Sequence, residues 1–191
     1  MDQKHLTVRL YSAQTPLVRS ILDRDGVCWS KEEYVARKYE ESGPILLTAY
    51  RWFVKEAAKI VPPPPGAEFP YWAFMDLYSV EGTRQDILAM DVPREEAIFF
   101  DLYDWNKIVQ LRYIGENQAD ERAFQRELRE RGLSANDVML TNFYPELKNH
   151  ILDSWKRLFR HHEAIQAGDL NGVGGVQAGL WQLKKEWIKK V

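Results

Sequence analysis

A helical repeat of apolar residues is clearest between residues 44 and 61. The apolar positions recur at intervals of three and four, which places them on one face of a helix; they are Leu46, Ala49, Phe53, Ala57 and Ile60. Pro44 suits a first helical turn. Pro62 ends the run, because the residue before a proline is disfavoured in the α region. The pattern predicts an amphipathic helix over residues 44–61 that buries one face.

The segment after this helix predicts a rigid spacer followed by a strand. Four consecutive prolines, residues 62–65, favour a stiff, extended chain. In residues 69–75 both sets of alternating positions are largely apolar, which is typical of a strand inside a sheet. Pro70 indicates that strand pairing begins only after it.

Shorter periodic runs predict the remaining elements. Strands are expected over residues 5–11, 27–29, 86–92, 97–100 and 176–183. Helices are expected over residues 16–25, 31–41, 104–113, 116–131 and 145–161, with a further short helix after Ser134. Thr15 and Gly26 mark the two ends of the first helix. This mixture predicts an α+β fold with mixed or antiparallel small sheets and flanking helices.

Length and composition favour a single compact domain over residues 1–191. The chain has 191 residues, of which 45% are apolar and 28% charged, as in ordinary globular proteins. Its seven tryptophans predict a tryptophan-rich core. Residues 116–131 carry only a thin apolar stripe, so we expect residues 116–140 to form a peripheral helical arm.

Charge and cysteine content argue against several classes of function. The net charge is −2, from 26 basic and 28 acidic residues, which gives no electrostatic argument for nucleic acid or an anionic membrane. A single cysteine, Cys28, excludes an internal disulfide and fits a reducing compartment. No run approaches the roughly 18 apolar residues of a membrane span, and the first residues lack a signal-peptide core. We expect a soluble, cytoplasmic protein without a membrane partner.

Common catalytic and cofactor motifs are absent from the sequence. It contains no phosphate-binding P-loop, no dinucleotide-binding glycine motif, no zinc-protease motif and no nucleophile elbow. One cysteine and four histidines predict no metal site. Cys28, between Val27 and Trp29, fits a small buried hydrophobe better than a nucleophile. Residues 168–175 hold four glycines, but a strand follows them, which favours a flexible connection over a phosphate loop.

Arg9 has the sequence context that points most directly to ligand binding. It lies on the first predicted strand, opposite that strand's apolar face. Ser12, Gln14 and Thr15 follow at the strand end, and such connections often carry binding residues. An arginine held there can grip a phosphate or carboxylate with two hydrogen bonds. An edge-strand arginine paired with a surface carboxylate explains the pattern equally well.

Three residues on later strands complete the candidate ligand-binding set. Tyr71 and Trp72 have flat faces that suit a base or a nicotinamide ring, although core packing explains each of them as well. Gln177 and Trp181 share a face of the last predicted strand. We predict that Arg9, Gln14, Trp72 and Gln177 line one hollow. No catalytic residue is predicted.

The chain resembles the bacterial domain of unknown function family 3841. The resemblance spans nearly the whole chain and is carried by short motifs in order; they are residues 10–15 (LYSAQT), the proline-rich stretch 62–72, residues 90–93 (MDVP), residues 100–101 with Trp105, residues 154–159 (SWKRLF) and residues 176–178 (VQA). This family implies no activity that can be transferred to the chain.

A second resemblance, to the opening of ADP-ribosyltransferase-type domains, implies an NAD cleft between two small sheets. Arg9 and Thr15 match the basic strand and polar turn of that opening, and Tyr71 or Trp72 matches its middle strand. Those domains usually carry a glutamate on a late strand, where this chain has Gln177. An amide lacks the charge with which a carboxylate stabilises a cationic transition state.

Two functional hypotheses follow from the sequence. The first is a nucleotide- or NAD-binding domain similar to ADP-ribosyltransferases, with NAD as the candidate cofactor. The second is a binding module without catalysis, whose aromatic cleft recognises a nucleotide, a modified base or a peptide. A third interpretation leaves all the tryptophans in the core and assigns function to surface contacts.

Overall fold

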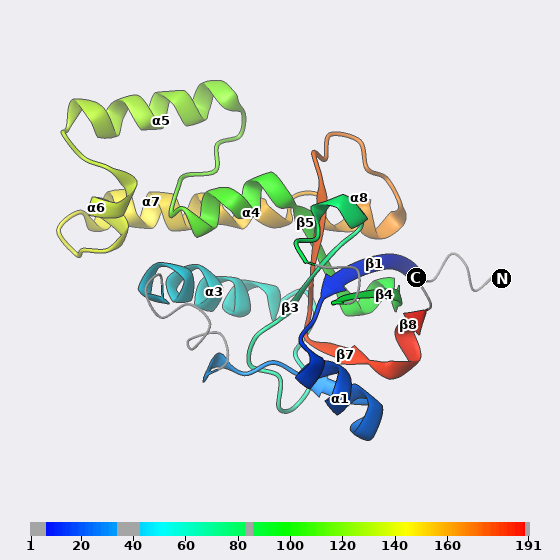
Figure 1. Ribbon diagram of the computed structural model, residues 1–191. Helices are drawn as coiled ribbons and strands as arrows, with labels where there is room; N and C mark the ends of the chain where they lie inside the picture. Colours follow the sequence, from blue (N-terminus) through cyan, green and yellow to red (C-terminus); the bar gives the residue numbers. More distant parts are fainter. Residues whose placement is uncertain (1–6, 34–42, 83–85, 190–191) are drawn as a thin grey trace.

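A computed structural model describes residues 7–33, 43–82 and 86–189 and has an α+β fold, as predicted (Figure 1). The strands are β1 (Thr7–Ala13), β2 (Val27–Trp29), β3 (Tyr71–Phe74), β4 (Ile87–Pro93), β5 (Ala97–Asp101), β6 (Val176–Leu180), β7 (Gln182–Lys184) and β8 (Ile188–Lys189). The α-helices are α1 (Pro16–Asp25), α3 (Gly43–Ala57), α4 (Leu102–Val109), α5 (Gln118–Glu130), α6 (Ala135–Met139), α7 (Pro145–Trp155) and α8 (His162–Ala167). Short 3-10 helices are η2 (Leu77–Ser79), η3 (Arg94–Glu96), η4 (Lys156–Phe159) and η5 (Lys185–Trp187).

The described strands form one six-stranded antiparallel sheet and one two-stranded sheet. The order in the large sheet is β5-β6-β3-β1-β4-β8, and β2 pairs with β7 in the small one. Strand β3 lies between β6 and β1, which confirms the prediction of an interior strand. The registers Tyr11 opposite Phe74, and Phe74 opposite Gln177, fix how β1, β3 and β6 lie beside one another.

Each face of the large sheet packs against its own hydrophobic cluster, because alternate side chains of a strand point to opposite faces. The first cluster joins Ile98 and Phe100 of β5 to helices α3, α4 and α7. The second cluster joins Leu10 of β1 and Phe99 of β5 to helices α1 and α8 and to the small sheet. Helices therefore cover both faces of the sheet (Figure 1).

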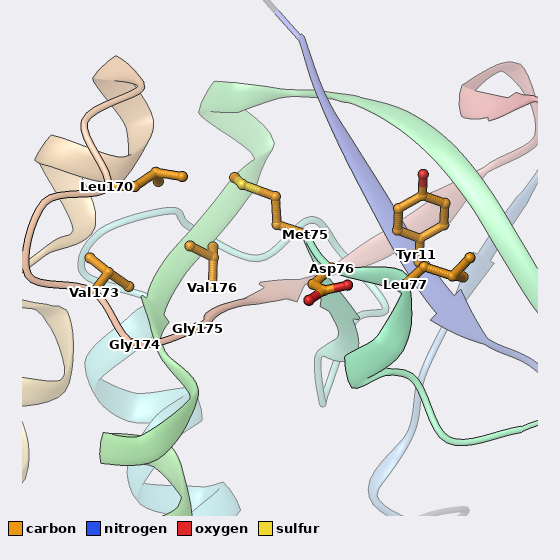
Figure 2. Close-up of a pocket in the computed structure, with 9 residues that line it drawn as sticks. All are labelled: Tyr11, Met75, Asp76, Leu77, Leu170, Val173, Gly174, Gly175 and Val176. Atoms are coloured by element: carbon orange, nitrogen blue, oxygen red, sulfur yellow. The ribbon is translucent and has the colours of Figure 1, made fainter.

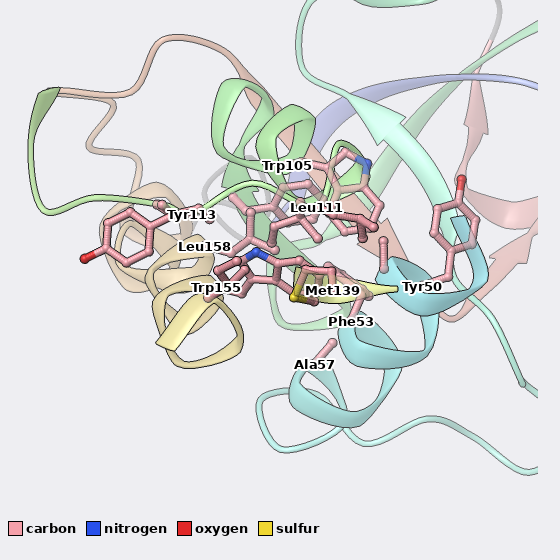
Figure 3. Packing of buried hydrophobic residues seen from close by; sticks show 14 of the residues in the cluster. Tyr50, Phe53, Ala57, Trp105, Leu111, Tyr113, Met139, Trp155 and Leu158 are labelled. Atoms are coloured by element: carbon pink, nitrogen blue, oxygen red, sulfur yellow. The ribbon is translucent and has the colours of Figure 1, made fainter. Parts of the chain in front are cut away.

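The first cluster is rich in tryptophan, as the composition predicts. Trp105, Trp155 and Trp181 are buried in it, and Trp52 and Trp72 pack against it. Figure 3 shows Trp105 and Trp155 meeting the side chains of α3. Such tilted and edge-on aromatic contacts contribute about 0.5–1.5 kcal/mol each beyond area burial.

Several predicted elements end at other residues in the structure, among them the helix over residues 44–61 and the strand over residues 176–183. Helix α3 ends at Ala57, and residues 58–61 continue as hydrogen-bonded turns rather than as helix. The last predicted strand, 176–183, is two strands interrupted at Trp181. There the indole N–H donates to the carbonyl of Val61 at 2.6 Å, and the chain leaves β6 to pair with β2.

Helices α5 and α6 lie at the end of the molecule away from the large sheet (Figure 1). Phe124 and Leu128 of α5 are buried and belong to the first cluster, as do Val138 and Met139 of α6. The remaining surface of α5 is mainly charged and exposed.

The predicted helix over residues 31–41 falls mostly outside the described residues. In the described part of the chain, no helix combines the length and the hydropathy that a membrane span needs.

Candidate functional site

Ser12, Gln14 and Trp72 are brought together by the pairing of β1 with β3. The Ser12 hydroxyl donates to the Trp72 carbonyl at 2.5 Å, and the Gln14 side-chain amide donates to the Ser12 hydroxyl at 2.8 Å. Ser12 is fully buried, so these bonds join the two strands within the fold. Three of the predicted site residues therefore lie together, and their hydrogen bonds connect β1 to β3 within the fold.

Arg9 lies at the other end of β3 from Trp72. Since β1 and β3 are antiparallel and Tyr11 pairs with Phe74, the residues before Tyr11 run past the end of β3. The Arg9 side chain is about half exposed, and its Nε donates to Asp91 at 2.6 Å. This hydrogen bond is the main reason that the pKa of Arg9 is raised. Neither Arg9 nor Trp72 lines either of the two hollows described below.

Thr15 caps helix α1, as its position in the sequence predicts. Its side chain accepts the N–H of Val18 at 3.4 Å. A side-chain cap of this kind contributes roughly 1 kcal/mol to the stability of a helix.

The two aromatic candidates point to opposite faces of β3. Trp72 packs in the first cluster, where its indole N–H donates to the Tyr50 hydroxyl at 3.0 Å. Tyr71 packs against the second cluster, where its hydroxyl lies 3.0 Å from the Sγ of the buried Cys28. Both rings contribute to packing, which matches the core interpretation of these residues.

Gln177 carries an unusual unpaired polar atom. The residue is 3% exposed, and its side-chain oxygen is buried without a hydrogen-bond partner among the described residues. Its neighbours across the sheet are Phe74 and Phe100. An unsatisfied buried acceptor costs about 1–3 kcal/mol.

A cavity of about 470 Å³ opens where β1 meets the ends of β3 and β6 (Figure 2). Its lining is one aromatic ring, one carboxylate and otherwise apolar or glycine residues; it comprises Tyr11, Met75, Asp76, Leu77, Leu170, Val173, Gly174, Gly175 and Val176. Figure 2 shows Tyr11 on one side and Leu170 and Val173 on the other, with Met75 and Asp76 between them. The volume is in the range of small-ligand sites.

Asp76 supplies the one charged side chain of this lining. One of its oxygens accepts the N–H of Tyr78 at 2.9 Å. No lysine or arginine of the described residues forms an ion pair with it. The nearest basic residue along β1 is Arg9, whose charge Asp91 balances. The cavity therefore has a net negative character.

The glycine-rich segment before β6 forms one wall of the cavity. Asp101 holds this wall, because its carboxylate accepts the N–H of Gly174 at 2.7 Å. The ring of Tyr103 lies so close to Gly174 that a Cβ atom there would be 2.6 Å from it. The Gly174 amide is therefore already used within the fold and is not available to a ligand.

Sequence reasoning did not identify Tyr11 and Asp76 as cavity residues. Tyr11 lies two residues after Arg9 in β1, and its sequence context does not point to a cavity. Asp76 lies just beyond the aromatic strand, where its sequence context indicates only a turn. A metal site has no support in the described residues, where no three histidine, cysteine, aspartate or glutamate side chains gather closely enough.

The fold and the cavity define an α+β domain with a small hollow at the strand ends. The chain belongs to the family described as domain of unknown function (DUF3841), whose family model matches residues 9–189. No curated protein and no solved structure matches the chain.

Proposed function

We propose that this protein is a binding module whose cavity between β1, β3 and the glycine-rich segment takes a positively charged side chain of a peptide. The observation that carries the proposal is the lining of that cavity, in which the Tyr11 ring and the Asp76 carboxylate are joined only by apolar and glycine residues. A carboxylate and an aromatic face both attract a cation, and the aromatic face contributes about 0.5–2 kcal/mol.

The apolar part of the lining favours a lysine side chain over a small free cation. Met75 and Val176 offer apolar surface to a methylene stem, as lysine stems pack on apolar surface while the head remains polar. Leu77 and Leu170 are 37% and 44% exposed at the same cavity, so they offer apolar contacts to the residues that flank the lysine.

Calorimetric titration of the protein with a lysine analogue tests this function. Nα-acetyl-lysine amide should bind, and the uncharged norleucine analogue should bind at least about fivefold more weakly, a difference of roughly 1 kcal/mol. Asp76→Asn should reduce the preference for the charged probe, because only the Tyr11 ring then attracts the cation. Asp169→Asn is the matched control, because Asp169 makes a similar bond to the N–H two residues ahead but does not line the cavity. Equal binding of the two probes would refute the proposal.

NAD binding is a second candidate, and one observation favours it. The oxidised nicotinamide ring is flat and positively charged, so the Tyr11 ring and the Asp76 carboxylate can attract it as they attract a lysine side chain. To bind the phosphates of NAD, Arg9 would have to break its ion pair with Asp91. NAD should then raise the melting temperature while NADH, whose ring is neutral, should not, and Arg9→Ala should abolish the shift. Release of nicotinamide on incubation would separate a transferase from a binding module.

A further inference from the structure

A second hollow, of about 890 Å³, lies under helix α5 and is separate from the cavity at the strand ends. Its α5 wall consists of Glu121, Phe124, Gln125, Leu128 and Arg129, which recur at helical spacing and therefore form one face of the helix. The opposite walls come from the start of α3, the end of α4 and residues 133–136. We call this hollow the α5 groove.

The α5 groove has apolar walls. Phe124 and Leu128 are buried beneath it, while Ile45, Leu46 and Leu133 remain partly exposed along it. Partly exposed apolar side chains that face one hollow stabilise the complex when a ligand covers them, by about 25 cal/mol for each Å² removed from water.

The unpaired charged side chains that line the groove are positive. Arg112 and Arg129 both line it, both are exposed, and neither guanidinium group forms a side-chain hydrogen bond or ion pair among the described residues. The lining has one acidic residue, Glu121. Lys107 balances its negative charge, since the ammonium group donates to the carboxylate at 2.5 Å. The same carboxylate accepts the N–H of Gly115 at 3.2 Å.

The backbone that presents Arg112 is strained. Helix α4 ends in two nested turns. The N–H of Leu111 donates to the carbonyl of Ile108, and the N–H of Arg112 donates to the carbonyl of Lys107, both at 2.8 Å. This helix ending needs a left-handed residue, usually glycine, and here Leu111 adopts a φ of 56°. The indole N–H of Trp155 also bonds the Arg112 carbonyl at 2.7 Å. Arg112 is therefore held at the groove by a defined turn.

We propose that the α5 groove binds a small amphiphile with an anionic head, such as a medium-chain carboxylate. The apolar walls cover the alkyl chain, and the two unpaired guanidinium groups bind the carboxylate through bidentate hydrogen bonds. The hollow is the size of a small-ligand site. From Glu121 to Arg129 the groove follows α5 for about 12 Å, at 1.5 Å per residue.

Titration of the full chain with decanoate, 1-decanol and decyltrimethylammonium tests the proposal. Decanoate should bind, and the neutral and cationic analogues should bind at least about tenfold more weakly, a difference of 1.4 kcal/mol. Amide resonances of Phe124 and Leu133 should shift with decanoate in two-dimensional NMR spectra.

Substitution of the two arginines locates the head group. The double variant Arg112→Gln/Arg129→Gln should weaken decanoate binding at least about tenfold. Arg126→Gln is the matched control, because Arg126 is an exposed arginine of the same helix that does not line the groove. All of these side chains are exposed, so melting temperatures should stay close to that of the unmodified chain.

Three results would overturn the proposal. The first is the absence of decanoate binding at about 1 mM. This result would overturn the proposal even if an acidic amphipathic peptide bound at the same arginines. The second is equal binding of decanoate and 1-decanol. The third is a loss of affinity in Arg126→Gln as large as in the double variant.

Discussion

At the scale of single residues, Leu111 combines backbone strain with complete burial. It is, within the described ranges, the one non-glycine residue with a positive φ, and its side chain is fully buried in the first cluster. A left-handed conformation costs a residue with a Cβ atom roughly 1–2 kcal/mol. The packing of the leucine side chain offsets this strain.

Glycine should therefore be a better replacement for Leu111 than alanine. Both substitutions lose the buried side chain, at about 2–5 kcal/mol, but glycine also relieves the left-handed strain. We expect Leu111→Gly to unfold at a higher urea concentration than Leu111→Ala, by about 1 kcal/mol in unfolding free energy. An alanine variant that is as stable as the glycine variant would contradict the account of this turn.

Gln177 offers a second test at this scale. Its side-chain oxygen is buried and has no hydrogen-bond partner in the described part of the chain, so replacement by an apolar residue of similar length removes a desolvated group. Gln177→Met should raise the unfolding free energy by about 1 kcal/mol. Gln166→Met serves as the comparison, because Gln166 donates to the Arg94 carbonyl at 3.2 Å and should lose stability when replaced. A loss of stability in Gln177→Met would show that its amide makes a needed bond.

At the scale of elements, the approach of α3 to the large sheet depends on Gly179 of β6. A Cβ atom at this position would be 2.9 Å from the ring of Phe53, which is fully buried, so one of the two would have to shift. The glycine therefore sets the distance between the helix and the sheet, and the first cluster forms around that contact.

Gly179→Ala should consequently destabilise the fold by about 1–3 kcal/mol, the usual range for overpacking. Gly175→Ala is its matched control on the same stretch of chain, since a Cβ atom there meets its nearest neighbour at 3.6 Å, an ordinary contact. Thermal unfolding of the two variants compares them directly. Equal melting temperatures would mean that Phe53 adjusts freely.

Elements were predictable from sequence to the extent that local spacing determines them. The apolar period located α3 and α7, and Thr15 and Ser134 cap their helices as expected. The break at Trp181 was not predictable, because residues 176–183 read as one continuous strand. The break is set by the long-range bond from the Trp181 indole to Val61.

At the scale of the whole molecule, the candidate site depends on strand register. Tyr11, Asp76 and Gly175 come from three separate segments, and no local pattern indicates that they meet. The sequence instead suggested Arg9 and Trp72, which the antiparallel pairing of β1 and β3 separates. Ser12 and Gln14 do lie beside the Trp72 backbone, and their hydrogen bonds join β1 to β3.

The pH dependence of stability is also a property of the whole molecule, and His162 contributes to it. This residue is 7% exposed, its Nδ1 accepts the N–H of Phe99 at 3.0 Å, and burial lowers its pKa. The unfolded chain therefore takes up a proton near pH 6.5 that the folded chain does not, so stability is full above about pH 6.5 and falls as the pH decreases towards the folded pKa.

Urea unfolding between about pH 7.5 and pH 5 measures this contribution. His162→Asn keeps an acceptor for the Phe99 amide but removes the titration, so its unfolding free energy should fall less steeply with acidification than that of the unmodified chain. The difference in slope should not exceed about 1.4 kcal/mol per pH unit, the limit for one proton. Identical slopes would contradict the role given to His162.

The central claim is that the cavity at the ends of β1, β3 and β6 binds a cationic side chain, and NMR titration with Nα-acetyl-lysine amide tests it most directly. We predict that the amide resonances of Gly175 and Leu77 shift at a lower concentration of the lysine probe than of its norleucine analogue, and that Asp76→Asn weakens the response to the lysine probe. Shifts confined to other parts of the chain, or equal shifts with both probes, would contradict the account.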